Sequence, residues 1–173
     1  MSVLRRYGGY LVLLGAALLA SGEALAGDNQ KGKVLVHGRF GNVTHSLVIP
    51  VGDAPEHFNI QQVRVDPPTE SQDWRWNGLT TTIYEQLDAY PTQGSFRIYF
   101  DANDPAQPAR GHAYGFFAGT FSVADDGSAK FSARGNLLGG NGDFAGVAGK
   151  VTVDGTITAA EGGRYTLTLT LTK

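Results

Sequence analysis

The chain has 173 residues, with 14 lysines and arginines against 16 aspartates and glutamates, and it has no cysteine. This length is enough for one domain with a hydrophobic core. The slightly acidic balance, without any basic run, argues against nucleic acids and anionic membrane surfaces as partners. Because the chain has no cysteine, it has no disulfides and no lipoprotein anchor, so an exported form must rely on its core for stability.

The first 26 residues have the pattern of a secretory signal peptide. Arg5 and Arg6 precede an uncharged apolar run, Leu11–Ala20, and Ala24-Leu25-Ala26 forms a small-x-small cleavage site. The apolar run is shorter than the ~20 residues that a membrane helix needs. We therefore predict a signal peptide at 1–26, a single domain at 27–173, a periplasmic or secreted location, and no membrane contact after cleavage.

Short strands separated by turns are expected in the first half of the chain. The pattern predicts strands at Lys33–Phe40, Ser46–Val51 and Ile60–Asp66. In the second of these, the continuous apolar run Leu47–Ile49 is typical of a strand buried on both faces. Pro50 places the end of that strand near an edge of the sheet.

The stretch Leu79–Tyr90 leaves two alternatives open. Its threonines, followed by Ile83 and Tyr84, favour a strand, whereas the helical spacing of Ile83, Leu87 and Tyr90 favours a short helix. Pro91 ends the element in either case.

The second half alternates more regularly. Ser95–Asp101 is expected to be a strand with Phe96, Ile98 and Phe100 on one face and Arg97 and Tyr99 on the other. Gly111–Ala124 is expected to be a long or bent strand with Phe117, Phe121 and Val123 on one side and Tyr114 and Phe116 on the other. Arg164–Lys173 alternates most cleanly, and its inward residues are expected to be Tyr165, Leu167, Leu169 and Leu171.

A glycine-rich stretch, Gly135–Gly149, lies between strand-like sequences at Ser128–Arg134 and Lys150–Ala159. Glycines in these positions indicate a tight connection with left-handed backbone and close approach of neighbouring chain. Strands at hairpin spacing, with glycines inside them, predict an all-β fold. We expect a single antiparallel β-barrel of about eight strands, because tight barrel curvature needs such glycines.

Several of these residues resemble the allene oxide cyclase and dirigent family of eight-stranded barrels. They are Gly111-His112-Ala113-Tyr114-Gly115, Phe121, Phe131, Gly135-Asn136 and, above all, the run from Gly139 to Gly149. The resemblance covers about Gly111–Lys173; the first half does not match the family, so no active-site residue is carried over. It implies a barrel whose interior holds a small hydrophobic molecule and steers cyclisation or coupling without a cofactor.

The residues themselves offer candidates for chemistry. His112 opens a long strand beside Tyr114, and Glu85 is an acid that burial in an apolar barrel would make suitable for proton transfer. Trp74 and Trp76 would share one face of an extended segment, either as a lid on a ligand pocket or as a plug in the core. Candidate ligand contacts are Trp74, Trp76, Phe96, Phe116 and Arg97, the last as a clamp for an anionic group.

Two functions follow from this pattern. The first is an exported protein that binds a small hydrophobic or aromatic ligand and acts, if it is an enzyme, as a cofactor-free cyclase or isomerase. The second is a non-catalytic envelope or interaction protein whose barrel is filled by its own side chains. The four histidines are scattered and no metal site is expected. No cofactor is expected, and self-association into a homo-oligomer is left open.

Overall fold

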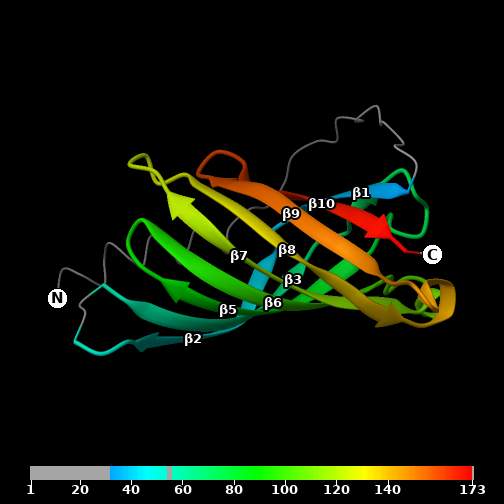
Figure 1. Cartoon of the computed structure of the whole chain (residues 1–173), viewed down its shortest axis with the longest axis horizontal. Coiled ribbons are helices and arrows are strands. Elements are labelled where there is room, and N and C mark those ends of the chain that lie inside the picture. The colour runs from blue at the N-terminus through cyan, green and yellow to red at the C-terminus, as the bar shows by residue number, and fades with distance from the viewer. Residues whose placement is uncertain (1–31, 54–55, 173) are drawn as a thin grey trace.

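The computed structural model describes residues 32–53 and 56–172, which form one antiparallel sheet curled into a half-barrel (Figure 1). The order of the strands across the sheet is β2-β3-β5-β6-β7-β8-β9-β10-β1-β4. The expected all-β, antiparallel fold is therefore confirmed. The predicted signal peptide lies outside the described residues.

Most strands are long and are joined to their neighbours by short turns, so sequence neighbours pair in space. The strands are β1 (Lys33–Arg39), β2 (Asn42–Pro50), β3 (Phe58–Asp66), β4 (Glu70–Ser71), β5 (Thr80–Ala89), β6 (Gln93–Asn103), β7 (His112–Val123), β8 (Ala129–Gly140), β9 (Gly149–Thr158) and β10 (Gly162–Leu171). Two 3₁₀ turns, η1 (Pro108–Arg110) and η2 (Gly142–Phe144), lie in the loops before β7 and β9.

A bend at Phe40–Gly41 joins β1 to β2 and brings the two ends of the sheet together. β1 pairs with β10, whereas β2 pairs with β3 at the far end of the strand order. The Phe40 amide donates to the Gly163 carbonyl at 2.8 Å, and the Gly41 amide donates to the Asp66 carboxylate at 2.8 Å. These two hydrogen bonds tie the β10 side and the β3 side of the sheet to the same bend.

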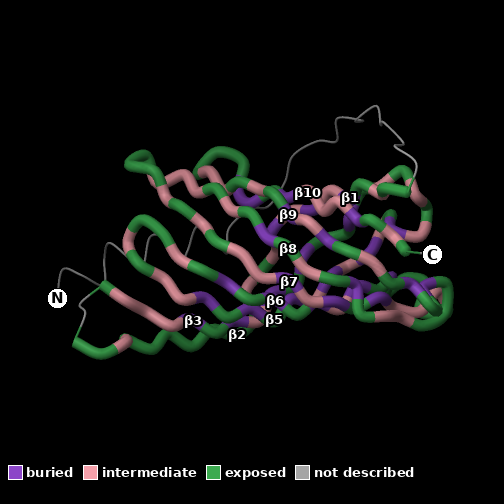
Figure 2. Tube along the Cα trace, in the orientation of Figure 1, coloured by how far each residue is buried: buried purple, intermediate pink, exposed green. Residues whose placement is uncertain are grey.

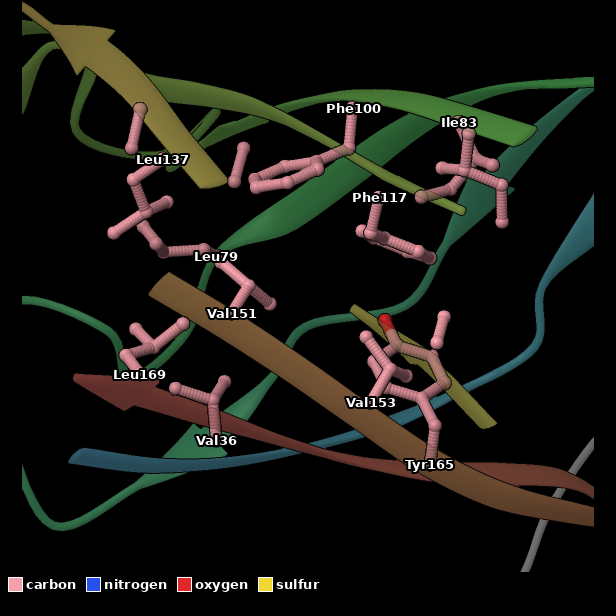
Figure 3. Packing of buried hydrophobic residues seen from close by; sticks show 14 of the residues in the cluster. Val36, Leu79, Ile83, Phe100, Phe117, Leu137, Val151, Val153, Tyr165 and Leu169 are labelled. Atoms are coloured by element: carbon pink, nitrogen blue, oxygen red, sulfur yellow. The ribbon is translucent and has the colours of Figure 1, made fainter. Parts of the chain in front are cut away.

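The core lies on the concave face of the sheet, where alternate residues of facing strands point toward one another (Figure 3). Phe96, Ile98 and Phe100 of β6 are buried, as are Tyr165 and Leu169 of β10. The faces expected for these two strands are confirmed, because their apolar residues repeat every second position. The Trp76 and Phe144 rings meet edge to face at 5.2 Å and close one end of the core.

Two expectations for the first half need correction. The ambiguous stretch before Pro91 is strand β5, which pairs with β6 along its whole length and with β3 from Thr81 onward, so the helix alternative is wrong. The apolar run of β2 is not buried on both faces. Leu47, Val48 and Ile49 are exposed, because β2 is the terminal strand of the sheet (Figure 2).

The glycine-rich stretch is divided between strand and turn. β8 continues to Gly140, beyond the expected strand end, and η2 follows. A Cβ built on Gly135 would lie 1.9 Å from the Phe116 carbonyl oxygen of β7, so the expected close approach of neighbouring backbone is confirmed. A register shift between Tyr114 and Gly115 of β7 lies opposite this part of β8.

Candidate functional site

The concave face encloses a cavity of about 390 Å³. Its walls come from nearly every long strand, and most of the lining is apolar. Representative apolar lining residues are Phe96, Ile98, Phe100, Phe117, Leu167 and Leu169. The interior is therefore not filled by the Phe and Leu side chains that point into it.

The cavity runs between two different ends. At the end where η1 and η2 lie, Trp76 and Leu79 line it and are buried. At the opposite end the lining includes Val48 and Tyr90, which are 37% and 46% exposed. Solvent therefore reaches the cavity lining beside β2 and the β5–β6 turn, and we call this end the mouth.

A charged polar cluster interrupts the mostly apolar lining. It consists of Arg64 and Asp66 from β3, Glu85 from β5 and Tyr165 from β10, all of which line the cavity and are buried. Arg64 Nε donates to Asp66 Oδ1 at 2.7 Å, and Arg64 Nη1 donates to Glu85 Oε2 at 3.4 Å. The guanidinium also lies 3.8 Å from the centroid of the Phe40 ring, a cation–π contact at the bend.

Each carboxylate of the cluster has further donors. Asp66 accepts from the Gly41 amide and from the Tyr165 hydroxyl, at 2.8 and 3.1 Å. Glu85 Oε2 also accepts from Gln62 Nε2 at 2.5 Å. Buried charges persist only when they are paired and hydrogen-bonded in this way. The cluster therefore links β3, β5, β10 and the bend through side chains.

Burial and charge set the protonation of two members. Burial raises the pKa of the Tyr165 phenol well above its ordinary value, and the Asp66 carboxylate raises it further. Burial by itself would lower the pKa of the Arg64 guanidinium, but Glu85 and Asp66 raise it above its ordinary value. Tyr165 is therefore a neutral hydrogen-bond donor, and Arg64 a fixed cation, throughout the physiological range.

We expect the raised pKa of Tyr165 to appear as a loss of stability in alkali. Above about pH 10 the unfolded chain releases the phenolic proton while the folded chain keeps it, so the free energy of unfolding falls as pH rises. This one group contributes a slope of up to about 1.4 kcal/mol per pH unit. Chemical denaturation between pH 9 and about 11 measures it.

Tyr165→Phe removes this component, and Tyr99→Phe, which changes an exposed tyrosine of β6, is the matched control. An alkaline slope that is the same in Tyr165→Phe as in the unchanged chain would contradict the assignment.

A histidine–aspartate pair lies at the mouth. His57 Nε2 is hydrogen-bonded to Asp88 Oδ1, and the His57 ring stacks on Tyr90 with centroids 4.2 Å apart. Tyr90 lines the cavity, whereas His57 and Asp88 do not. This pair fixes one wall of the mouth.

Three of the predicted site residues line the cavity. Glu85 belongs to the polar cluster, Phe96 lies on the apolar wall, and Trp76 is at the closed end. Trp74 does not share a face with Trp76. It is 63% exposed, and the Arg110 guanidinium lies 5.6 Å from its ring centroid.

The remaining predicted residues lie on the convex face of the sheet. Arg97 alternates with the buried residues of β6, and Tyr114 and Phe116 alternate with the buried residues of β7. His112 Nδ1 lies 3.0 Å from a carboxylate oxygen of Asp101, also outside the cavity. The structure does not bring these four residues to the residues of the cavity.

Sequence reasoning missed Arg64 and Tyr165 as members of the polar cluster, and Gln62 as a hydrogen-bond donor to Glu85. The alternation of side chains along β3 was the available signal, because it places Gln62, Arg64 and Asp66 on the same face as Ile60. Within the described part of the chain, no group of three or more histidines, cysteines or acids is placed to hold a metal ion. The same part contains no helix with the length and apolar character of a membrane span.

No protein-family model, curated protein or solved structure matches the chain. The resemblance to the allene oxide cyclase and dirigent family therefore stays a prediction.

Proposed function

We propose that the protein binds a small hydrophobic or aromatic molecule inside the curled sheet. The observation that carries this proposal is a cavity of about 390 Å³ with an apolar lining and one buried polar cluster. Ligand pockets have volumes of about 300–1,000 Å³ and combine apolar walls with a few polar groups that orient the ligand. The cavity has both properties.

Two polar features of the cavity would orient the ligand. Glu85 lines the cavity, and Trp76 contributes an Nε1–H that is buried without a hydrogen-bond partner among the described residues. Buried polar atoms without partners are rare in proteins, and a bound molecule would supply one here. We therefore infer a ligand with an apolar body and at least one oxygen atom.

Catalysis at this site would use Glu85. A carboxylate that takes a proton from one carbon of the ligand and returns it at another leaves the protein unchanged, so an isomerisation or cyclisation needs no cofactor. The Arg64 guanidinium and Gln62 hold Glu85 in place through its Oε2. This proposal agrees with the cofactor-free cyclase or isomerase that the resemblance implies.

We also propose that the protein belongs to the allene oxide cyclase and dirigent family and is exported from the cytoplasm. If β1 and β2 are counted as one bent strand and the two-residue β4 is set aside, eight strands line the cavity, which is the number in allene oxide cyclase and dirigent barrels. The signal pattern of residues 1–26 supports export to the periplasm or the exterior.

The alternative is a non-catalytic envelope protein with a filled barrel. The Trp76–Phe144 contact fills one end of the interior in the way that this alternative requires. The volume that stays open between that contact and the mouth favours ligand binding.

The proposal predicts that a bulky side chain at the mouth blocks binding. Ala89 lines the cavity, so Ala89→Trp places an indole inside it. We expect this variant to bind the neutral apolar dye N-phenyl-1-naphthylamine at least about tenfold more weakly than the unchanged chain, a loss of about 1.4 kcal/mol. Fluorescence titration measures the affinity.

The matched control is Ala118→Trp. Ala118 pairs with Arg97 of β6 and Arg134 of β8, on the convex face. This control is expected to bind the dye as the unchanged chain does. Equal affinity of both tryptophan variants would show that the dye binds outside the cavity, and the proposal would fail.

A further inference from the structure

Strand β2 is an edge that no other described strand covers. Eight of its nine residues pair with β3 on one side, Thr44 being skipped at a bulge, and β2 ends the strand order on the other side. An edge strand presents a row of backbone N–H and C=O groups that can pair with another strand. Figure 2 shows β2 as an exposed segment at the border of the sheet.

The side chains of β2 do not protect this edge. Leu47 is 55% exposed on the convex side, with Ile49 beside it, and the strand carries no lysine, arginine, aspartate or glutamate. Proteins normally protect edges with charged residues, short strands, bulges or prolines. The bulge between Val43 and His45 and the terminal Pro50 flank the edge, and the segment between them pairs with β3 in regular register.

The other end of the sheet is protected. There the last strand is β4, which has two residues and includes Glu70. A short, charged strand is a usual way of blocking an edge. The contrast leaves β2 as the less protected edge of the described sheet.

β2 also borders the mouth of the cavity. Val48 pairs with Ile60 of β3, and both line the cavity, so they share the concave face. A strand added to β2 would therefore continue the cavity wall at the place where the lining is exposed.

We propose that β2 pairs antiparallel with β2 of a second copy of the chain, about a two-fold axis near Leu47. An uncharged apolar edge is complementary to another uncharged apolar edge, and a two-fold arrangement covers both edges at once and leaves neither free. A foreign peptide would cover β2 but would present its own free edge. The second copy is thus the occupant that best fits the chemistry of β2.

This pairing would complete the proposed binding site. In antiparallel pairs, directly opposed residues point to the same face, so Val48 of the second copy lies opposite Ser46 on the concave side. The second copy then adds an apolar side chain to the wall of the mouth. This part of the inference rests on the proposed function, whereas the pairing itself does not.

Leu47→Lys tests the pairing without altering the lining of the cavity. Two lysines would face each other across the two-fold axis and two leucine contacts would be lost, so the dissociation constant of the dimer should rise more than about a hundredfold. Gln61→Lys is the matched control, because Gln61 pairs with Leu47 but lies one strand away from the edge. Sedimentation velocity should give a dimer for the unchanged chain and for Gln61→Lys, and a monomer for Leu47→Lys.

Hydrogen exchange on the unchanged chain provides a test that needs no variant. Amides of β2 should lose protection when the dimer is diluted, and amides of β6 should not. A monomer at every concentration, or a dimer whose β2 amides are unaffected by dilution, would overturn the inference. A monomer that still binds N-phenyl-1-naphthylamine would overturn the pairing and leave the proposed function standing. A dimer that binds no dye would support the pairing and overturn the proposed function.

Discussion

Replacing Arg64 with leucine is expected to lower the free energy of unfolding by about 3–5 kcal/mol, because it leaves buried carboxylates without their cation. Arg64 donates to Asp66 and to Glu85, and all three side chains are buried. Removing one partner of a buried charge network costs far more than removing a surface ion pair, since water cannot replace the lost partner. Urea denaturation at neutral pH measures the difference.

Arg97→Leu is the matched control, because Arg97 is an exposed arginine on the convex face. It should change the free energy of unfolding by no more than about 0.5 kcal/mol. The double variant Arg64→Leu/Glu85→Gln should recover part of the loss, because Glu85 then no longer carries an unpaired buried charge. A loss at Arg64 no larger than at Arg97 would contradict the buried network.

Gly41→Ala is expected to destabilise the protein by about 3 kcal/mol, the upper part of the range for overpacking. A Cβ at this position would lie 1.8 Å from the Val65 carbonyl oxygen, and that backbone cannot move without disturbing β3. The displacement would also disturb the hydrogen bond from the Gly41 amide to Asp66. The substitution thus acts on the bend that brings the two ends of the sheet together, and thermal and urea denaturation both measure it.

Gly52→Ala separates this effect from the general cost of replacing a glycine. Gly52 has a φ of +60° and nothing within 4 Å of its Cβ position. Its replacement by alanine should therefore lower the free energy of unfolding only by the cost of holding a side chain in the left-handed region, about 1–2 kcal/mol. Gly41→Ala should therefore be the more destabilising of the two. If the order were reversed, the close approach at the bend would not be important for stability.

The strands that sequence reasoning placed well are those whose apolar residues alternate. β6 and β10 have apolar side chains on every second position, so their inward faces follow from the pattern alone. In β3 the apolar pattern does not mark the inward face, because the inward row contains Gln62, Arg64 and Asp66 while valines occupy the outward row. A polar inward row is stable only when partners on other strands satisfy it, and those partners are not visible in a local pattern.

The position of a strand in the sheet also cannot be predicted from the local sequence pattern. The apolar run of β2 is typical of a strand buried on both faces, but burial depends on which strands lie beside it. The bend at Phe40–Gly41 sends β2 to the end of the strand order, where β3 is its only neighbour in the described sheet. The expectation for Leu47 failed because long-range pairing, and not composition, decides exposure.

The candidate site was predictable in part. Glu85 and Phe96 were named from the sequence and line the cavity, because they fall on the inward rows of β5 and β6. The expected common face of Trp74 and Trp76 was wrong, since the segment is a turn and not an extended strand. The Trp76 amide donates to the Asp73 carbonyl at 3.0 Å, and this turn directs the two indoles to different environments.

Native mass spectrometry of the chain purified from its own host tests the central claim most directly. If the cavity binds a small hydrophobic molecule, the unchanged chain should carry a defined additional mass that organic solvent extracts, and Ala89→Trp should lack it. A chain that carries no additional mass, and whose tryptophan fluorescence does not respond to a panel of hydrophobic compounds, would contradict the claim and favour the filled, non-catalytic barrel.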